Sequence, residues 1–264
     1  MDVHEPGWQR LARSTLAVTG AGVGAAVSTL VHDPILGSMA GQAFAEIGNE
    51  FATRVLAPRE EQRIATVLVL AAGGVIANQT LGMTLRSDGF FDGDRSDADQ
   101  IIEGMLLAAK TEHEEKKLPY MANLLARTPF LEGMDVYVLE KLIAEAESTS
   151  WLQLQLLAIV HRPKELPLPD VQYSGRASDW NEWAVTQTLT ELLDARRLLV
   201  FPSSKGAHGQ PGFDLRMSSI KLGQLGALLV QTMELTSIPL DELRPLHEEL
   251  ICHAVELTEP SSLE

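Results

Sequence analysis

The stretch from Trp151 to Leu235 constrains the fold more than any other part of the chain. Its residue patterns predict a helix, a loop, a second helix, a strand, a long polar turn, a second strand and a third helix. This order is typical of a winged-helix-like module. The sequence therefore predicts such a module in the C-terminal part of the protein.

The β-hairpin of this module has the clearest local signal. Phe213, Leu215 and Met217 alternate with polar residues, which is the period-2 pattern of a half-buried strand. The apolar run 198–201 is suited to be its partner strand. The eleven letters between them, PSSKGAHGQPG, are dense in glycine, proline and serine and predict a turn.

The helices on either side of the hairpin have recognisable starts. Asp179 can cap the first of them, and Glu182 completes a capping box. Ser219 can cap the second helix, in which Gly223 and Gly226 are expected to permit close packing. The apolar residues of the first helix share one face, namely Val185, Leu189, Leu192 and Leu193.

Composition extends the helical prediction to the whole chain. Hydrophobic residues make up 45% of the sequence and aromatic residues only 5%, so the core consists mostly of leucine, alanine and valine, which suit helices. We predict a mainly α fold with three regions. These are a Gly/Ala-rich apolar helical region (1–90), an amphipathic helical region (91–147), and the winged-helix-like module with one β-hairpin plus a C-terminal helix (148–264).

The start of the third region leaves a choice between helix and strand. Leu152, Leu154 and Leu156 alternate with glutamines, as in a strand, but Leu156 also shares a helical face with Leu152, Ile159 and Val160. Ser150 is a suitable N-cap for a helix. We therefore predict a helix.

Charge and cysteine content indicate the compartment and the kind of partner. The net charge of −15 disfavours binding to nucleic acid or to anionic lipid. The single cysteine, Cys252, excludes an intrachain disulfide framework and fits a reducing compartment. The first residues, Met1 to Trp8, do not resemble an export signal. We therefore expect a cytoplasmic protein.

Two uncharged runs, 14–31 and 64–85, raise the question of membrane insertion. A membrane-spanning helix needs roughly 20 mostly apolar residues. Both runs contain small or polar residues and neither is continuously apolar, so we interpret them as buried helices of a soluble protein. The alternative is that residues 14–85 insert as a hairpin at the inner face of the cell membrane.

Catalytic motifs are weak in this sequence. The glycine-rich turn 18–24 and the pair Tyr137 and Lys141 have the spacing of short-chain dehydrogenases. However, no alternating strand–helix pattern surrounds the turn, as that fold requires. The sequence also lacks a nucleophile elbow, a phosphate-binding loop and a zinc-protease motif. We predict no catalytic residue, no cofactor and no enzymatic activity.

Metal-binding patterns are also incomplete. Asp92, Asp94, Ser96 and Glu103 occupy positions 1, 3, 5 and 12 of a calcium-binding loop, but Asp97 stands where that loop needs glycine. We interpret the stretch as a solvated acidic loop in which Ser96 caps the next helix, and binding of a cation stays an alternative.

The remaining donor residues predict no metal site. His247, Cys252 and His253 have the wrong spacing for ligands on a helix. His113 lies in the charged run 112–117 and is interpreted as solvated, as are the glutamates beside it. Within this run Glu112 and Lys116 have the i, i+4 spacing of a helix-surface ion pair.

The helix before the hairpin favours a protein partner over DNA. In a winged helix this helix reads the DNA, yet here it carries four acidic residues and ends in two arginines. Its first turn holds Trp180 and Trp183, which suit a protein contact. The candidate partner-contact residues are therefore these two tryptophans together with Lys205 and His208 of the turn. A winged-helix transcriptional regulator is the alternative, because Arg216 can extend this basic wing.

Four segments between about residues 100 and 235 form a recognisable pattern, namely EEKKLPYMANLLA (114–126), STSWLQLQLLAIV (148–160), LTELLDARRLLVF (189–201) and SIKLGQLGALLV (219–230). This pattern resembles a bacterial family associated with phage defence, the abortive-infection alpha (Abi-alpha) type. The resemblance implies a non-enzymatic role in antiviral defence, without catalytic residues.

Together these patterns predict a bacterial interaction protein of a phage-defence or stress-response system. It would bind a protein partner or form a homo-oligomer, and we infer no small-molecule substrate. The alternatives are the membrane-active effector and the transcriptional regulator described above.

Overall fold

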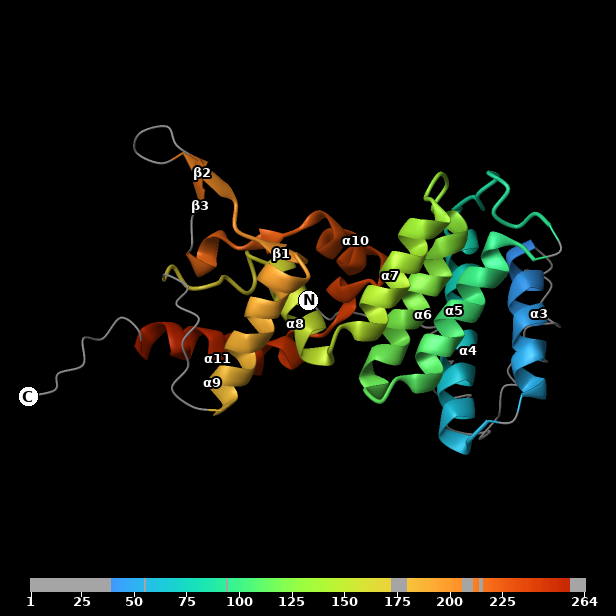
Figure 1. Ribbon diagram of the computed structural model, residues 1–264, viewed down its shortest axis with the longest axis horizontal. Coiled ribbons are helices and arrows are strands. Elements are labelled where there is room, and N and C mark those ends of the chain that lie inside the picture. Colours follow the sequence, from blue (N-terminus) through green and yellow to red (C-terminus); the bar gives the residue numbers. More distant parts are fainter. Residues whose placement is uncertain are drawn as a thin grey trace, which may run out of the picture. The chain divides into compact units, whose positions relative to one another are not determined.

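The chain forms two compact units in the computed structural model (Figure 1). The structure describes residues 39–54, 56–93, 95–171, 180–205, 211–213 and 216–256. Unit 1 holds the residues up to Thr149 together with Thr232–Glu234, and unit 2 holds Ser150–Gln231 and the residues from Leu235 onward. Helices dominate both units, and a β-hairpin lies in unit 2, so the prediction of a mainly α fold with one β-hairpin is confirmed.

Unit 1 is a bundle of helices that lie side by side in Figure 1. Helix α4 contacts α3, α5 and α6, and α5 also contacts α3 and α7. The elements of this unit are α3 (Met39–Thr53), α4 (Pro58–Thr80), α5 (Asp97–Thr111), η1 (Glu115–Lys117), α6 (Leu118–Arg127), η2 (Thr128–Phe130) and α7 (Val136–Ser148).

Helix α4 supplies much of the core of unit 1. It begins at Pro58, and the Glu60 carboxylate accepts the N–H of Ala57 at 3.0 Å, as expected for a helix with an acidic first turn. Its buried face comprises Ile64, Ala65, Val67, Leu68, Leu70, Ala71, Ala72, Gly74 and Val75. Among the described residues α4 is the one helix long and apolar enough to cross a membrane, yet half of its most apolar 18 residues are buried inside the protein. The other uncharged run, 14–31, lies outside the described residues.

The loop between α4 and α5 is anchored by a buried arginine. Arg86 is 6% exposed and forms two hydrogen bonds to the Asp88 carboxylate, from Nε at 2.7 Å and from Nη2 at 2.6 Å. Its guanidinium lies 4.2 Å from the ring centre of Phe90, and Nη2 also donates to the Met134 carbonyl at 2.9 Å. The Gly133 N–H completes the network by donating to Asp88 Oδ2 at 2.8 Å.

This network makes part of the stability of unit 1 dependent on pH. The Arg86 hydrogen bonds, followed by that from the Gly133 N–H, lower the pKa of Asp88 well below its ordinary value of 3.8. A lowered folded-state pKa stabilises the fold above the unfolded pKa, and this contribution is lost as the pH falls toward the folded pKa. We therefore expect Asp88→Asn to destabilise the protein at pH 7, with a smaller difference from wild type at pH 3. Urea denaturation of both proteins at the two pH values measures this, and a difference that grows on acidification would contradict it.

A short segment from far along the sequence completes unit 1. Met233 is fully buried, and its carbonyl accepts a hydrogen bond from the buried Asn123 side chain at 3.1 Å. The neighbouring Glu234 accepts from Arg127 Nε at 2.8 Å and has a left-handed backbone, with φ of 55°. Helix α6 therefore binds residues that follow it by more than a hundred positions.

Unit 2 contains the remaining helices and all the strands of the described residues. Its elements are α8 (Trp151–His161), α9 (Trp180–Thr190), the π-helical turn η3 (Glu191–Ala195), β1 (Leu199–Val200), β2 (Ser203–Lys205), β3 (Pro211–Phe213), η4 (Met217–Ser219), β4 (Lys221–Leu222), η5 (Leu235–Ser237) and α11 (Leu240–Glu256). Helix α10 (Gln224–Thr232) also belongs to this unit except for its last residue.

Helix α8 contacts α9, α11 and β4. The choice of helix over strand for this segment is confirmed, and Ser150 caps it by accepting the Gln153 N–H at 3.2 Å. At its other end Arg162 donates to the carbonyls of Leu235, Thr236 and Ile238. These bonds tie the C-terminus of α8 to the segment that begins with η5.

The strands pair differently from the prediction. Strand β1 pairs with β4, with Leu199 opposite Leu222, whereas the sequence predicted a pair between 198–201 and 213–217. The hairpin is instead formed by β2 and β3, which lie inside the segment predicted as a turn except for Phe213, the first residue of the predicted second strand. The N–H of Met217 is used elsewhere, donating to the Val171 carbonyl at 2.9 Å.

Two glycines explain why β1 lies where it does. A Cβ on Gly223 would lie 2.3 Å from the carbonyl oxygen of Arg197, and a Cβ on Gly226 would lie 2.1 Å from that of Leu198. The predicted close packing at these glycines is thereby confirmed, and the Gly223 N–H donates to the Leu198 carbonyl at 2.8 Å. The predicted start of this helix at Ser219 is wrong, because η4 and β4 occupy 217–222 and α10 begins at Gln224.

Candidate functional site

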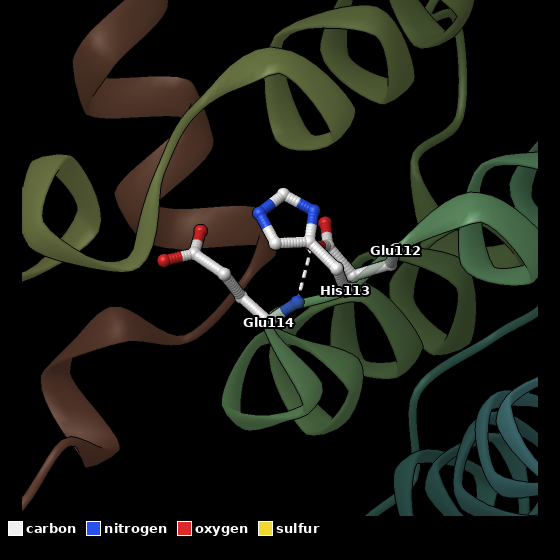
Figure 2. Close-up of side chains that lie close together, drawn as sticks. All are labelled: Glu112, His113 and Glu114. Atoms are coloured by element: carbon white, nitrogen blue, oxygen red, sulfur yellow. Dashed lines mark hydrogen bonds and ion pairs between the residues drawn. The ribbon is translucent and has the colours of Figure 1, made fainter.

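Three consecutive donor residues gather where α5 ends in unit 1. Glu112 follows the last residue of α5, and His113 and Glu114 lead into η1. One donor atom from each lies within 4.8 Å of the others, and Figure 2 shows the imidazole between the two carboxylates. The exposure of the three differs, since Glu112 is 4% exposed whereas the side chain of His113 is 88% exposed.

Glu112 is held by a buried lysine. Lys117 Nζ forms an ion pair with Glu112 Oε2, and both side chains are 2% exposed. The other oxygen, Oε1, accepts the Glu114 N–H at 2.8 Å, and Lys117 Nζ also donates to the Glu147 carbonyl at 3.0 Å. The ammonium therefore joins the end of α5 to the end of α7 through one carboxylate and one carbonyl.

This arrangement fits an ion pair better than a metal ligand set. Glu112 Oε1 lies 3.7 Å from His113 Nδ1, a separation that two ligands of one ion can have, but Glu112 Oε1 already accepts the Glu114 N–H at 2.8 Å and Oε2 pairs with Lys117. A cation between these two atoms would share Glu112 with the Lys117 ammonium, and the two positive charges would repel each other. We therefore assign Glu112 as the counter-ion of Lys117.

The sequence interpretation of the charged run is partly corrected by these contacts. Glu112 pairs with Lys117 instead of Lys116, because α5 ends at Thr111 and the helical register is broken. Glu112 is also buried instead of solvated, while Glu115 and His113 are exposed as predicted. One signal that pointed to Lys117 is its i, i+4, i+7 spacing with the buried Met121 and Leu124.

The residues at the calcium-loop positions have other partners. Ser96 caps α5 as predicted, accepting the Asp99 N–H at 3.2 Å, and its hydroxyl donates to Asp99 Oδ2 at 2.9 Å. Glu103 binds two guanidinium groups, Arg54 at 2.9 Å and Arg95 at 2.7 Å. Asp94 lies outside the described residues. Two of the four positions are thus engaged in capping and ion pairing.

The candidate partner-contact residues lie in unit 2. Trp183 is on α9, and 52% of its surface is exposed. Trp180 is the first residue of the same helix and Lys205 is the last residue of β2, but the side chains of both lie outside what the structure describes. His208 is not among the described residues.

Trp183 begins a row of exposed residues that we call the α9 outer row. Its members are Trp183, Gln187, Glu191 and Asp194, spaced by four, four and three residues, and all four are exposed. The spacing of four places Trp183, Gln187 and Glu191 along one side of α9, and Asp194 is exposed on the π-helical turn η3 that follows. The row thus combines one large aromatic group with two carboxylates.

Two other candidate sets are not brought together as a site. Tyr137 is 74% exposed on α7, and Lys141 forms an ion pair with Glu145 at 2.8 Å, so this pair is part of a helix surface. His247 Nε2 lies 2.9 Å from the Pro167 carbonyl, which gives this buried histidine a structural contact. The side chains of Cys252 and His253 lie outside the described residues.

The fold and these contacts define a mainly helical protein with a buried ion pair in unit 1 and an exposed aromatic and acidic row in unit 2. No family model, no curated protein and no solved structure matches the chain.

Proposed function

We propose that the protein is a non-enzymatic interaction protein that binds a protein partner, or a second copy of itself, through the α9 outer row. The observation that carries this proposal is Trp183, with 52% of its surface exposed on a helix. Tryptophan contributes a large contact area for little conformational entropy and is enriched among the residues that dominate binding energy at protein interfaces.

The resemblance to the Abi-alpha type supports a setting in bacterial antiviral defence or stress response. We propose that binding of the partner to α9 produces the defence or stress response and that no catalysed reaction is involved. The order of elements in unit 2, a helix, a short strand, a hairpin, a further strand and a helix, supports a winged-helix-like module that is used for protein contact. A cytoplasmic location is part of the same proposal.

Membrane insertion and DNA binding are weaker proposals. To insert, α4 would have to leave its contacts with α3, α5 and α6 and expose its buried face. The apolar side chains of α3, α5 and α6 that α4 covers would then be exposed to water, at about 1.5–3 kcal/mol for each side chain of leucine or valine size, so a strong compensating force is needed. For DNA binding, the α9 outer row carries two carboxylates, which repel phosphate.

The proposal is tested by site-specific cross-linking of the full chain. A photo-reactive amino acid is placed at Trp183 and, as a matched control, at Tyr137, which is also an exposed aromatic residue but lies in unit 1. We expect Trp183 to give a discrete cross-linked protein during phage infection and Tyr137 to give several-fold less. In the purified complex, Trp183→Ala should weaken binding by about 2 kcal/mol, whereas Tyr137→Ala should leave it within twofold.

Three results would contradict this function. Equal cross-linking from the two positions would remove the α9 outer row from the interface. Recovery of the chain with membranes during infection would favour the membrane-active effector. A salt-sensitive shift of duplex DNA by the purified protein would favour the regulator.

A further inference from the structure

We infer that the α9 outer row binds a positively charged helical segment of its partner, and this inference rests on the proposed function. The row offers one indole on α9 and two carboxylates at its C-terminal end, and these groups differ in how they attract a cation. An exposed tryptophan ring attracts arginine or lysine through its negative face. Glu191 and Asp194 attract the same side chains through charge and hydrogen bonding.

The spacing of the row specifies the spacing of the cations. Trp183 and Glu191 are eight residues apart, which corresponds to roughly 12 Å along a helix at 1.5 Å per residue. A partner helix packed along α9 would present two basic residues at the same separation, about eight positions apart. One would lie over the indole ring and the other against the carboxylates. This requirement distinguishes a helix from a compact cation, which cannot reach both ends.

One of the two carboxylates is already held in position. Gln153 is buried, its Oε1 accepts the Ser150 N–H at 2.9 Å, and its Nε2 donates to Glu191 Oε2 at 3.0 Å. The N-cap of α8 therefore fixes the orientation of Glu191 on the neighbouring helix. A carboxylate that is fixed before binding loses less side-chain entropy in the complex.

The basic residues after the row do not cancel this preference. Arg196 is half-buried and already has an interaction partner within the protein. Arg197 is exposed, but its left-handed backbone, with φ of 54°, ends the helical register and takes it out of the row. The net charge of −15 for the whole chain adds a long-range attraction for a cationic partner.

The test uses the full chain and a labelled amphipathic helical peptide of 20 residues. The peptide carries two arginines eight positions apart on its leucine-bearing face, and a matched peptide carries glutamines instead. Fluorescence anisotropy gives the dissociation constants. We expect Glu191→Gln with Asp194→Asn to weaken arginine-peptide binding about fivefold, as for loss of two exposed ion pairs, and Trp183→Ala to weaken it further. The arginine peptide should also bind more weakly at high salt.

A control variant separates the row from net charge. Asp241→Asn with Glu242→Gln removes the same two charges from the exposed first turn of α11 and should change binding less than twofold. Asp194→Asn alone, which leaves the Gln153 contact intact, should give an intermediate loss. Equal losses from the two double variants, equal binding of the two peptides, or no binding of the arginine peptide would overturn the inference. If Trp183→Ala abolished partner binding while the charge variants did not weaken it, the interaction function would stand and the cationic partner would not.

Discussion

Replacing Lys117 with alanine is expected to destabilise the protein by about 3–5 kcal/mol, the cost of leaving one member of a buried ion pair without its partner. The Glu112 carboxylate is 2% exposed, and it would lose its ion pair and keep the hydrogen bond from the Glu114 N–H. The carbonyl of Glu147 would also lose its hydrogen bond from Nζ. Chemical denaturation followed by circular dichroism measures the change.

A double variant tests the cause of this loss. Lys117→Met with Glu112→Gln removes both charges, retains similar volumes and still lets the amide oxygen accept the Glu114 N–H. We expect it to be more stable than Lys117→Ala, because no buried charge is left unpaired. The control is Lys116→Ala at the exposed neighbouring lysine, which should change stability by no more than about 0.5 kcal/mol. Equal losses at Lys116 and Lys117 would contradict the assigned ion pair.

Adding one methyl group at Gly226 is the second change expected to have a large effect. The new Cβ would lie 2.1 Å from the carbonyl oxygen of Leu198 and 2.9 Å from its carbonyl carbon, so the β1 backbone or α10 would have to shift. Overpacking of this kind typically costs about 1–3 kcal/mol, and a clash with rigid backbone belongs at the upper end. We expect Gly226→Ala to lower the free energy of unfolding by about 2–3 kcal/mol.

Gly104 provides a matched control for this substitution. It also lies within a helix, α5, but a Cβ there would have only Ile143 Cδ1 nearby, at 4.0 Å. Because alanine favours a helix by about 1 kcal/mol over glycine, Gly104→Ala should be neutral or slightly stabilising. Thermal unfolding of the two variants compares them directly. A stabilising Gly226→Ala would show that β1 does not lie as close to α10 as the structure places it.

The candidate site could be predicted only in part. The sequence identified the charged run 112–117 but assigned Glu112 to Lys116, since a continued helix puts residues four apart on one face. Helix α5 ends at Thr111, so residues four apart no longer share a face beyond it. Which lysine pairs with Glu112 then depends on the burial of Lys117. Trp183 was identified as a candidate contact from its residue type and helix, whereas the acidic row that follows it required knowledge of which side of α9 is exposed.

Local patterns in the sequence determined where several helices begin and indicated the close packing at two glycines. Ser96 and Ser150 cap helices where the sequence predicted them, and Pro58 begins α4, because capping and proline geometry depend on residues only a few positions apart. Close packing at Gly223 and Gly226 was also expected from the sequence, although Gly223 precedes α10 instead of lying within it.

Only the tertiary structure decided which distant segments meet. The alternating residues 213–217 were predicted to pair with β1, but β1 pairs with β4, because Gly223, just before α10, and Gly226, within it, admit the backbone of Arg197 and Leu198. Helix α6 binds Met233 and Glu234 through Asn123 and Arg127, over a hundred residues apart in sequence. The spacing of apolar and polar residues specifies which face of a segment is buried. It does not specify which other segment packs against that face, because many segments could do so. The choice among them depends on backbone approach and on buried polar groups finding partners.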